Sequence, residues 1–373
     1  MPVVVIIIGA FLFSSIVTAV YRYFWSENLT VEIKFKEDSV VEGTESELTE
    51  TIMNRKWLFL PFLQVAFETN RNLNFGEEEN VSVSDRCYKR DVFSVGGYQK
   101  ITRTIPFYCS KRGYYEINDI DIITRNPLLT EKLHASSKQD IFIYGYPKRM
   151  EDDRMDISFQ KIMGEIQAKK SIYEDPFEFT GIREYHPADP MSRINWKASA
   201  KAEDWMVNVY GSTNAQEIMI FLDFEAETAG IFDYIHEQQI RLAVTLAERF
   251  AETGIQVGLI TNGKDIKMDQ TLNLPAGTGS QQMLSINRGL SRIDLTKRAD
   301  AMEKFVSEER KNMSHTQKTY IMISKNQRKN CYEAFLNLVQ QGTSGFWINM
   351  HDSDTEWLLP KHDNVTVIDW EVE

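Results

Sequence analysis

The sequence predicts a mixed α/β protein with an N-terminal transmembrane helix, an antiparallel β-sandwich and a doubly wound α/β domain. Three observations lead to this prediction. No charged residue interrupts the apolar run from Val3 to Tyr21. Apolar and polar residues alternate between residues 30 and 147, and beyond residue 217 continuous apolar strands alternate with amphipathic helices. The last pattern is typical of a mostly parallel sheet that is covered by helices on both faces.

The composition excludes several classes of protein. Among 373 residues, 42 are Lys or Arg and 54 are Asp or Glu, which gives a net charge of −12. Because binding to phosphates needs a basic surface, we expect no nucleic-acid partner. A hydrophobic share of 42% and a charged share of 26% exclude a disordered chain and a many-pass membrane protein. The three cysteines form no CxxC pair, so we expect no disulfide framework and a reducing compartment.

Residues 1–25 are expected to form a single membrane-spanning helix, because about 20 apolar residues cross a hydrocarbon core. A cleaved signal peptide is the main alternative, although the basic region that begins such peptides is missing. Arg22 lies at the far end of the helix among aromatic residues of the kind that sit at headgroup level. This placement favours a single-pass protein in the cell membrane with its body in the cytoplasm.

The period-two alternation in residues 30–147 predicts the β-sandwich. The apolar positions of TVEIKF, LQVAFE and DIFIYG face one side, and turn signals such as Gly96-Gly97 separate the strands. Residues 148–180 are highly charged and hold few large apolar side chains. We therefore expect a solvated linker there, partly helical, between two domains.

The α/β domain brings acidic residues to a strand end. The strand EIMIFLDF ends at Asp223, and ligands of doubly wound sheets bind at such carboxyl ends. Asp223, Glu225 and Glu227 lie in one short loop, where they either coordinate a hard cation or repel one another in solvent. The next strand, IQVGLIT, is followed by Asn262-Gly263, which predicts a tight turn.

Residues 181–201, GIREYHPADPMSRINWKASAK, resemble the signature of the bacterial domain-of-unknown-function family 58. The family pattern is R-E-Y-x-x-G-D-x-x-R-x-I-x-W-x-x-S-A-[RK], and Ala188 stands where the glycine is usual. The RGYY run that begins at Arg112 also matches a late R-G-x-Y of the family's β-sandwich. The matching residues of the signature are Arg183, Glu184, Tyr185, Asp189, Arg193, Ile194, Trp196, Ser199, Ala200 and Lys201.

The resemblance implies that residues 181–373 contain a von Willebrand factor A-like domain, whose best-known relatives bind Mg²⁺ through D-x-S-x-S, a distant threonine and a later aspartate. Here Glu225 and Glu227 replace the serines, Thr278 is the candidate threonine, and Lys325 stands in place of the last aspartate. We therefore expect a degenerate, metal-free site in which the Lys325 ammonium neutralises the Asp223 cluster. Mg²⁺ binding remains the alternative.

Two interpretations of the signature stay open. Asp189 and Arg193 are four residues apart, and a charge-assisted pair between them would fix a loop on which Tyr185 and Trp196 pack. In the structural interpretation this segment, with Ser199, clamps the first strand of the sheet. In the functional interpretation Arg193, Trp196 and Lys197 form a partner surface, because arginine and aromatic residues are favoured in interfaces.

The sequence thus yields two hypotheses of function. In the first, the protein is a membrane-anchored, non-enzymatic scaffold without a cofactor. The resemblance implies a MoxR-type AAA+ ATPase as a candidate protein partner. In the second, the protein is a divalent-cation-dependent enzyme or metal-dependent adhesion module that uses Asp223, Glu225 and Glu227.

Overall fold

The computed structural model describes residues 2–76, 81–84, 86–172, 179–187, 189–210, 216–225, 233–312, 318–339, 344–352 and 357–372. It contains two compact units. Unit 1 comprises Met1–Lys148 with Leu290–Arg292, and unit 2 comprises Arg149–Gly289 with Ile293–Glu373. Each unit is described by itself.

Helix α1, Pro2–Phe24, is long and apolar enough to span a membrane. Its last turn differs from the expected belt of headgroup aromatics. Tyr21 and Trp25 are buried in the core of the β-sandwich, and the Tyr21 hydroxyl donates a hydrogen bond to the Phe59 carbonyl. Arg22, expected at the membrane surface, forms an ion pair with Glu131 at 2.7 Å. The helix therefore enters the sandwich directly, because its aromatic side chains find apolar partners there.

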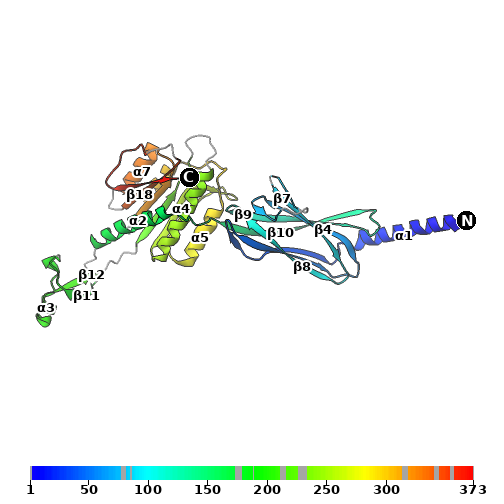
Figure 1. The fold of residues 1–373 in the computed structure, drawn as a ribbon, viewed down its shortest axis with the longest axis horizontal. Coiled ribbons are helices and arrows are strands. Elements are labelled where there is room, and N and C mark those ends of the chain that lie inside the picture. Colours follow the sequence, from blue (N-terminus) through cyan, green and yellow to red (C-terminus); the bar gives the residue numbers. More distant parts are fainter. Residues whose placement is uncertain are drawn as a thin grey trace. The chain divides into compact units, whose positions relative to one another are not determined.

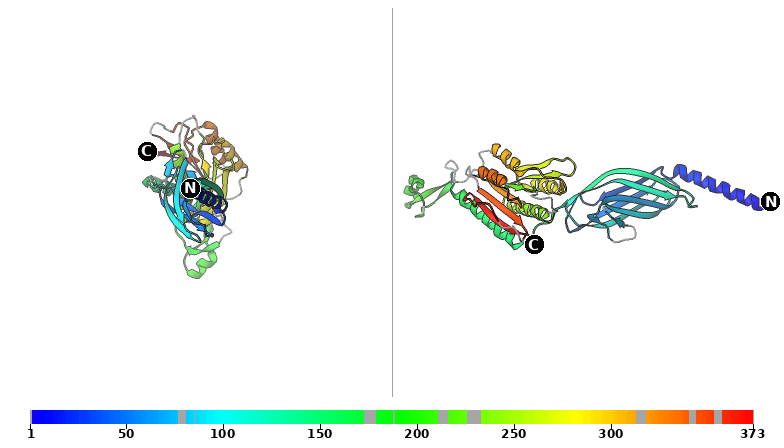
Figure 2. Two further views of the ribbon diagram at one scale, coloured as in Figure 1. Left: turned by 90° about the vertical axis from the view of Figure 1, so that its right-hand side faces the viewer. Right: turned by 90° about the horizontal axis from the view of Figure 1, so that it is seen from above.

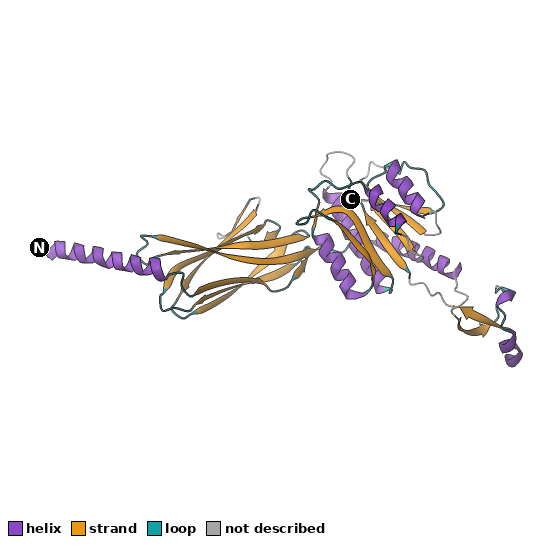
Figure 3. Ribbon diagram, turned by 180° about the vertical axis from the view of Figure 1, so that it is seen from behind, coloured by secondary structure: helices purple, strands orange, loops and turns teal. Residues whose placement is uncertain are grey.

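Unit 1 is a β-sandwich of two sheets, drawn in orange in Figure 3. One sheet has the order β1-β3-β8-β5 and the other the order β2-β10-β9-β4-β7-β6. The pairs are antiparallel except for β2 with β10. The strands are β1 Leu29–Phe35, β2 Ser39–Val41, β3 Glu45–Asn54, β4 Leu60–Asn70, β5 Leu73–Asn74, β6 Val81–Val83, β7 Arg86–Val95, β8 Lys100–Cys109, β9 Gly113–Arg125 and β10 Lys132–Tyr146.

The RGYY run has a structural role in this sandwich. Tyr115 is buried, and its hydroxyl donates a hydrogen bond to the Lys111 carbonyl, which closes the turn into β9. A Cβ atom at Gly113 would lie 2.8 Å from the Tyr115 ring, and one at Gly145 would lie 2.9 Å from it. The ring therefore requires glycine at both positions.

A charged cluster lies inside unit 1. Glu50, Lys89 and Asp91 are each 1% exposed, and Arg103 donates a hydrogen bond to Asp91 at 2.8 Å. Lys89 Nζ lies 3.6 Å from the other Asp91 oxygen. Neither oxygen of Glu50 has a hydrogen-bond partner within the described part of the chain. Burial, reinforced by the Asp91 carboxylate, raises the pKa of Glu50 to about 8.

Unit 2 begins with a packed helix where we expected a solvated, partly helical linker. Helix α2, Asp153–Ile172, buries Met155, Ile162 and Ile166 almost completely and packs on strand β18, Ser344–His351. These three residues are seven and four positions apart, so they share one face of a helix. The helical part of the prediction for 148–180 agrees with α2, whereas the expected solvation was wrong for this stretch, because the charge of the segment was weighed above the spacing of its few apolar residues.

The large sheet of unit 2 has the order β15-β14-β13-β17-β18-β19, and β16 pairs with β14. Strands β14, β13, β17, β18 and β19 are parallel neighbours, whereas β15 and β16 run antiparallel to β14. The strands are β13 Glu217–Leu222, β14 Gln256–Asp265, β15 Thr271–Gly277, β16 Ile293–Asp294, β17 Lys318–Ser324, β18 Ser344–His351 and β19 Val365–Glu371.

Helices cover both faces of this sheet (Figure 2). Helix α6, Met302–Lys311, and α7, Lys329–Val339, share one core with Met219, Phe221 and Tyr320. Helix α4, Asp233–Glu252, packs on β13, β14, β17 and β18 from the other side. Helix α5, Gly279–Ser291, follows β15. The doubly wound architecture follows from continuous apolar strands that bury both of their faces.

The signature residues form a separate small element, labelled β11, β12 and α3 in Figure 1. Strands β11, Phe179–Glu184, and β12, Met206–Tyr210, pair antiparallel in a sheet of their own. Between them lie a 3₁₀ turn, Met191–Arg193, and helix α3, Trp196–Ala202. We expected the signature to clamp the first strand of the large sheet, whereas its strands pair with each other.

The position of Glu50 generates a prediction on pH. The folded-state pKa of about 8 exceeds the ordinary value of 4.5. The stability that a protonated Glu50 contributes is therefore complete below pH 4.5 and is lost as the pH rises towards about 8. Glu50→Gln cannot ionise, so its advantage over the parent should grow by roughly 3.5 kcal/mol between about pH 5 and about pH 8.

Amide hydrogen exchange of the sandwich strands in the full chain measures this advantage at each pH. The matched control is Glu47→Gln, an exposed position on the same strand. A Glu50→Gln variant whose stability follows the pH dependence of the parent would contradict the assignment.

Candidate functional site

The candidate site lies at the point where the chain changes direction in the large sheet. From the first strand, β13, the connection through α4 leads to β14 on one side, and the later strand β17 pairs on the other side. Asp223 follows β13 directly, and Ser324 is the last residue of β17. Ligands of doubly wound sheets bind at this switch point, outside the carboxyl ends of the strands.

The Asp223 carboxylate is fully buried and held by three donors. Ser324 Oγ donates to one oxygen at 2.7 Å. Asn262 Nδ2 donates to the other at 2.6 Å, and the Glu225 amide donates to that same oxygen at 2.9 Å. Burial nevertheless raises the pKa of Asp223 to about 6, because loss of water outweighs these hydrogen bonds. The site therefore favours a proton on Asp223 in mildly acidic conditions.

Asn262 is the functional residue that the sequence analysis missed. The tight turn predicted at Asn262-Gly263 was wrong, because β14 continues to Asp265 and the chain reverses between Asp265 and Thr271. Asn262 is fully buried and also donates to the Asp300 carbonyl at 2.8 Å, while its side-chain oxygen accepts from the Phe224 amide. The sequence does contain a signal for Asn262: it is a polar residue that directly follows the apolar run of a buried strand, where the strand pattern still predicts burial.

The cation at this site is Arg328. Its guanidinium pairs with Glu225, whereas Lys325 Nζ lies 3.4 Å from Asp352. We expected Lys325 to neutralise the Asp223 cluster, but the donors on Asp223 are Ser324, Asn262 and a backbone amide. The reason is strand alternation: the Ser324 side chain reaches Asp223, so the next side chain turns away from it.

Thr278, the expected threonine of the site, does not join it. Thr278 follows β15, which runs antiparallel to β14 with Gly277 opposite Val257. Val257 lies near the start of β14, whereas Asn262 lies towards its end. Thr278 is therefore at the opposite end of the strands from Asn262, about 15 Å away from it. Glu227 lies outside the described residues.

The donor set does not fit the Mg²⁺ that the resemblance implies. Both Asp223 oxygens accept hydrogen bonds from the protein, and Glu225 is engaged by a guanidinium. The Asn326 Nδ2 donor is buried close to Ser324 and has no hydrogen-bond partner among the described residues, and a donor repels a cation. Within the part of the chain that the structure describes, no three His, Cys, Asp or Glu side chains gather closely enough to hold a metal ion.

The signature element is organised by polar contacts. Both Arg183 Nη atoms bind the Asp189 carboxylate, at 2.7 and 2.6 Å. This bidentate pair lowers the pKa of Asp189 to about 2. The pair expected between Asp189 and Arg193 is replaced by this one, because Pro190 and the 3₁₀ turn interrupt the helical geometry that a spacing of four requires.

The aromatic residues of the signature also differ from expectation. Tyr185 packs on Trp205 with ring centroids 5.3 Å apart. Trp196 is 67% exposed, and Lys197 beside it is exposed as well. Asn195 caps α3 through the Ala198 amide, and Ser199 Oγ donates to the Asn195 carbonyl. Arg193 is half-buried next to these residues.

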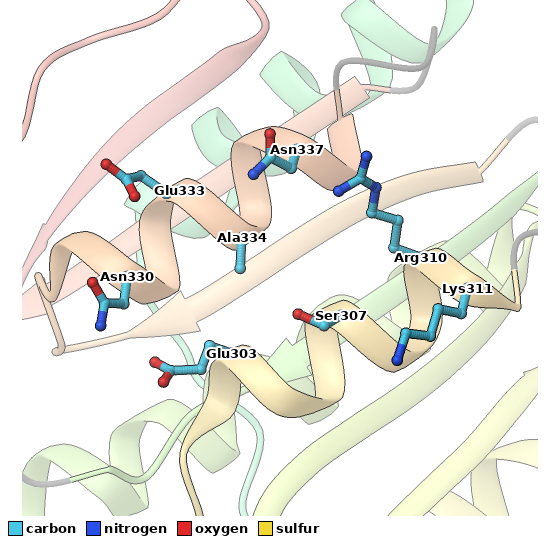
Figure 4. A pocket seen from close by; sticks show the side chains of 8 residues that line it. All are labelled: Glu303, Ser307, Arg310, Lys311, Asn330, Glu333, Ala334 and Asn337. Atoms are coloured by element: carbon cyan, nitrogen blue, oxygen red, sulfur yellow. The ribbon is translucent and has the colours of Figure 1, made fainter.

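A hollow of about 520 Å³ lies between α6 and α7 (Figure 4). Figure 4 shows Glu303 and Asn330 at one end and Arg310 at the other. Among the described residues that line it, Ala334 alone is apolar, whereas ligand pockets are mostly apolar. The hollow therefore supports no ligand hypothesis.

A substitution at Asn262 tests the buried network. Asn262→Asp should lower the free energy of unfolding by about 3–5 kcal/mol near neutral pH, because two buried carboxylates would stand within hydrogen-bond distance. At about pH 5 the loss should shrink, since a protonated carboxyl can donate to its neighbour. Denaturant unfolding of the full chain at both pH values measures the effect. Asn262→Ala is the control, which removes the same hydrogen bonds without adding charge. Equal pH dependence in the two variants would argue against the network.

Comparison with known proteins gives a family but no function. No curated protein matches the chain. Among solved structures, a CARDB domain from Pyrococcus furiosus in complex with di-metal ions is 19% identical, and the match covers 31% of this chain and 84% of that one, with a TM-score of 0.21. A Pseudomonas fluorescens alkylpurine DNA glycosylase is 11% identical, with 31% and 30% covered and a TM-score of 0.19.

The protein AvmM, described as catalysing macrocyclization in alchivemycin A biosynthesis, is 8% identical, with 34% of this chain and 94% of that one covered and a TM-score of 0.24. All three scores are too low to carry an argument. The family described as "Protein of unknown function DUF58" matches residues 181–373, from the signature element to the C-terminus. Because this match spans more than half of its residues, the chain belongs to that family.

Proposed function

We propose that this protein is a membrane-anchored, non-enzymatic scaffold whose unit 2 is a degenerate von Willebrand A-like domain that works without a metal ion. The parallel order β14-β13-β17-β18, the helices on both faces and an aspartate directly after the first strand support the von Willebrand A-like interpretation. Helix α1 supports the anchor. We infer that the rest of the chain lies in the cytoplasm, because Arg22 is in the last turn of that helix and the cysteines form no disulfide bonds.

One observation carries this proposal: the chain's own side chains fill the positions around Asp223. Ser324 and Asn262 take the two carboxylate oxygens, and Arg328 takes Glu225. A group that is already satisfied inside the protein gains little from a cation, which must first displace those donors. Such a domain would then bind its partners through its protein surface and not through a metal ion.

The family resemblance supplies a candidate partner, a MoxR-type AAA+ ATPase. A scaffold that carries an α/β unit on a membrane anchor could hold such a soluble ATPase at the membrane. The net charge of −12 disfavours a nucleic-acid partner. This assignment is an analogy at the level of the family and assigns no catalytic group to the chain.

The metal-free site predicts indifference to divalent cations. Mg²⁺, Mn²⁺ or Ca²⁺ at about 5 mM should shift the melting temperature of the full chain by less than about 1 °C. A cation at 100 times its Kd would instead stabilise the protein by roughly 2.7 kcal/mol. Binding at micromolar strength that disappears in Asp223→Ala, but persists in the exposed control Asp269→Ala, would favour the cation-dependent enzyme or adhesion module.

The scaffold role predicts a stable protein partner that is bound to unit 2 at the membrane. Lysine-reactive cross-linking of native membranes, followed by mass spectrometry, should join lysines of unit 2 to an AAA+ ATPase. Cross-links from unit 1 to the same ATPase serve as the comparison, because the proposal assigns docking to unit 2. Recovery of unit 2 without any ATPase peptide would contradict the proposed partner.

A further inference from the structure

We propose that residues 179–210, which we call the signature element, join two copies of this chain through a two-fold symmetric contact centred on α3. The inference does not rest on the proposed function, because neither the metal-free site nor an ATPase partner enters its argument. It starts from a mismatch between the polar and the apolar contacts of the element.

Several polar groups that shape the element pair within it. Arg183 binds Asp189 with both Nη atoms, Asn195 Nδ2 donates to Asn208 at 2.7 Å, and the Met206 amide donates to Ser199 Oγ. Among the described side chains of the element, only Ile194 and Val207 are buried apolar residues. A two-stranded ribbon with so small a core is marginal in water. The conformation of the element is therefore fixed before any partner binds, but the element buries little apolar surface by itself.

Among the described side chains of the element, five large apolar ones are exposed. Each is 42–67% exposed, and they are Phe179, Ile182, Met191, Trp196 and Trp205. With about 200 Å² for a large apolar side chain, these fractions amount to roughly 550 Å². A standard interface buries about 800 Å² per partner, of which slightly more than half is apolar. The exposed apolar area of the element is enough to supply that share.

The charge of the element favours a second copy as the occupant. Residues 179–210 hold four basic and four acidic side chains, so the whole net charge of −12 lies elsewhere in the chain. Two copies that approach through other surfaces repel each other on average, whereas two signature elements do not. A strongly acidic or basic partner would gain nothing from a neutral element.

Helix α3 is self-complementary when two copies pack antiparallel. Trp196, Lys197, Ala200 and Lys201 are exposed and lie at the spacing of one helical face. An axis near Ala200 places Lys197 of one copy opposite Glu203 of the other, and the small Ala200 allows close approach. The two-fold symmetry repeats this ion pair on both sides of the axis.

Light scattering of the full chain in detergent micelles, between about 1 and about 100 µM, tests the proposal. The parent should form a dimer that dissociates on dilution. Trp196→Ser should weaken the dimer by about 30-fold, as expected for a buried interface tryptophan. Trp57→Ser, at a tryptophan of unit 1 that is 63% exposed, is the matched control and should leave the dimer unchanged.

A charge swap keeps the test independent of folding. Lys197→Glu should weaken the dimer about tenfold, and adding Glu203→Lys should restore it, because the pair is rebuilt with reversed signs. Lys100→Glu, an exposed lysine of unit 1, is the control for net charge. A parent that stays monomeric over the whole range, equal effects of Trp196→Ser and Trp57→Ser, or a swap that does not restore the dimer would each overturn the proposal.

Discussion

The buried carboxylate of Asp223 is the constraint on which the organisation of unit 2 depends. A carboxylate without water must receive hydrogen bonds or a proton, and here three donors from three segments meet on it. Asn262 can serve only if β14 stays extended past the end of β13, so the chain reverses later, after Asp265. Because Asn262 also holds the Asp300 carbonyl, the same carboxylate fixes the approach to α6.

The ion pairs around this centre follow from the geometry of the strand ends. Ser324 points at Asp223, and the Asn326 amide turns back to Ser324 Oγ, which bends the loop towards α7. That bend brings Arg328 to Glu225 and leaves Lys325 near Asp352. Distance along the sequence made Lys325 the nearer cation, but the direction of each side chain decides which cation arrives.

The long periodic segments could be predicted from the sequence, and the local exceptions could not. The sandwich strands and the alternation after residue 217 follow from apolar residues at periods of 2 and 3.6. Such a periodic signal draws on many positions, so a single exceptional residue does not change it. The packing of helix α2 was missed because only three buried residues carry it amid many charges. The Asp189 pair was misassigned because one proline changes the local geometry, so Arg183 from strand β11 arrives instead. Asn262 was missed because its partners lie 38 and 39 residues away.

The two units and the signature element reach stability by different means. Unit 1 tolerates an ionisable Glu50 in its interior because the surrounding sandwich buries a large apolar core. The parallel sheet of unit 2 buries both faces of its strands. The signature element has neither resource: beside its two buried residues, Ile194 and Val207, its shape depends on hydrogen bonds, each with a modest net contribution of about 1 kcal/mol. In the proposed dimer the exposed apolar side chains of this element supply most of the contact area, and the Lys197–Glu203 pairs fix the orientation of the two copies.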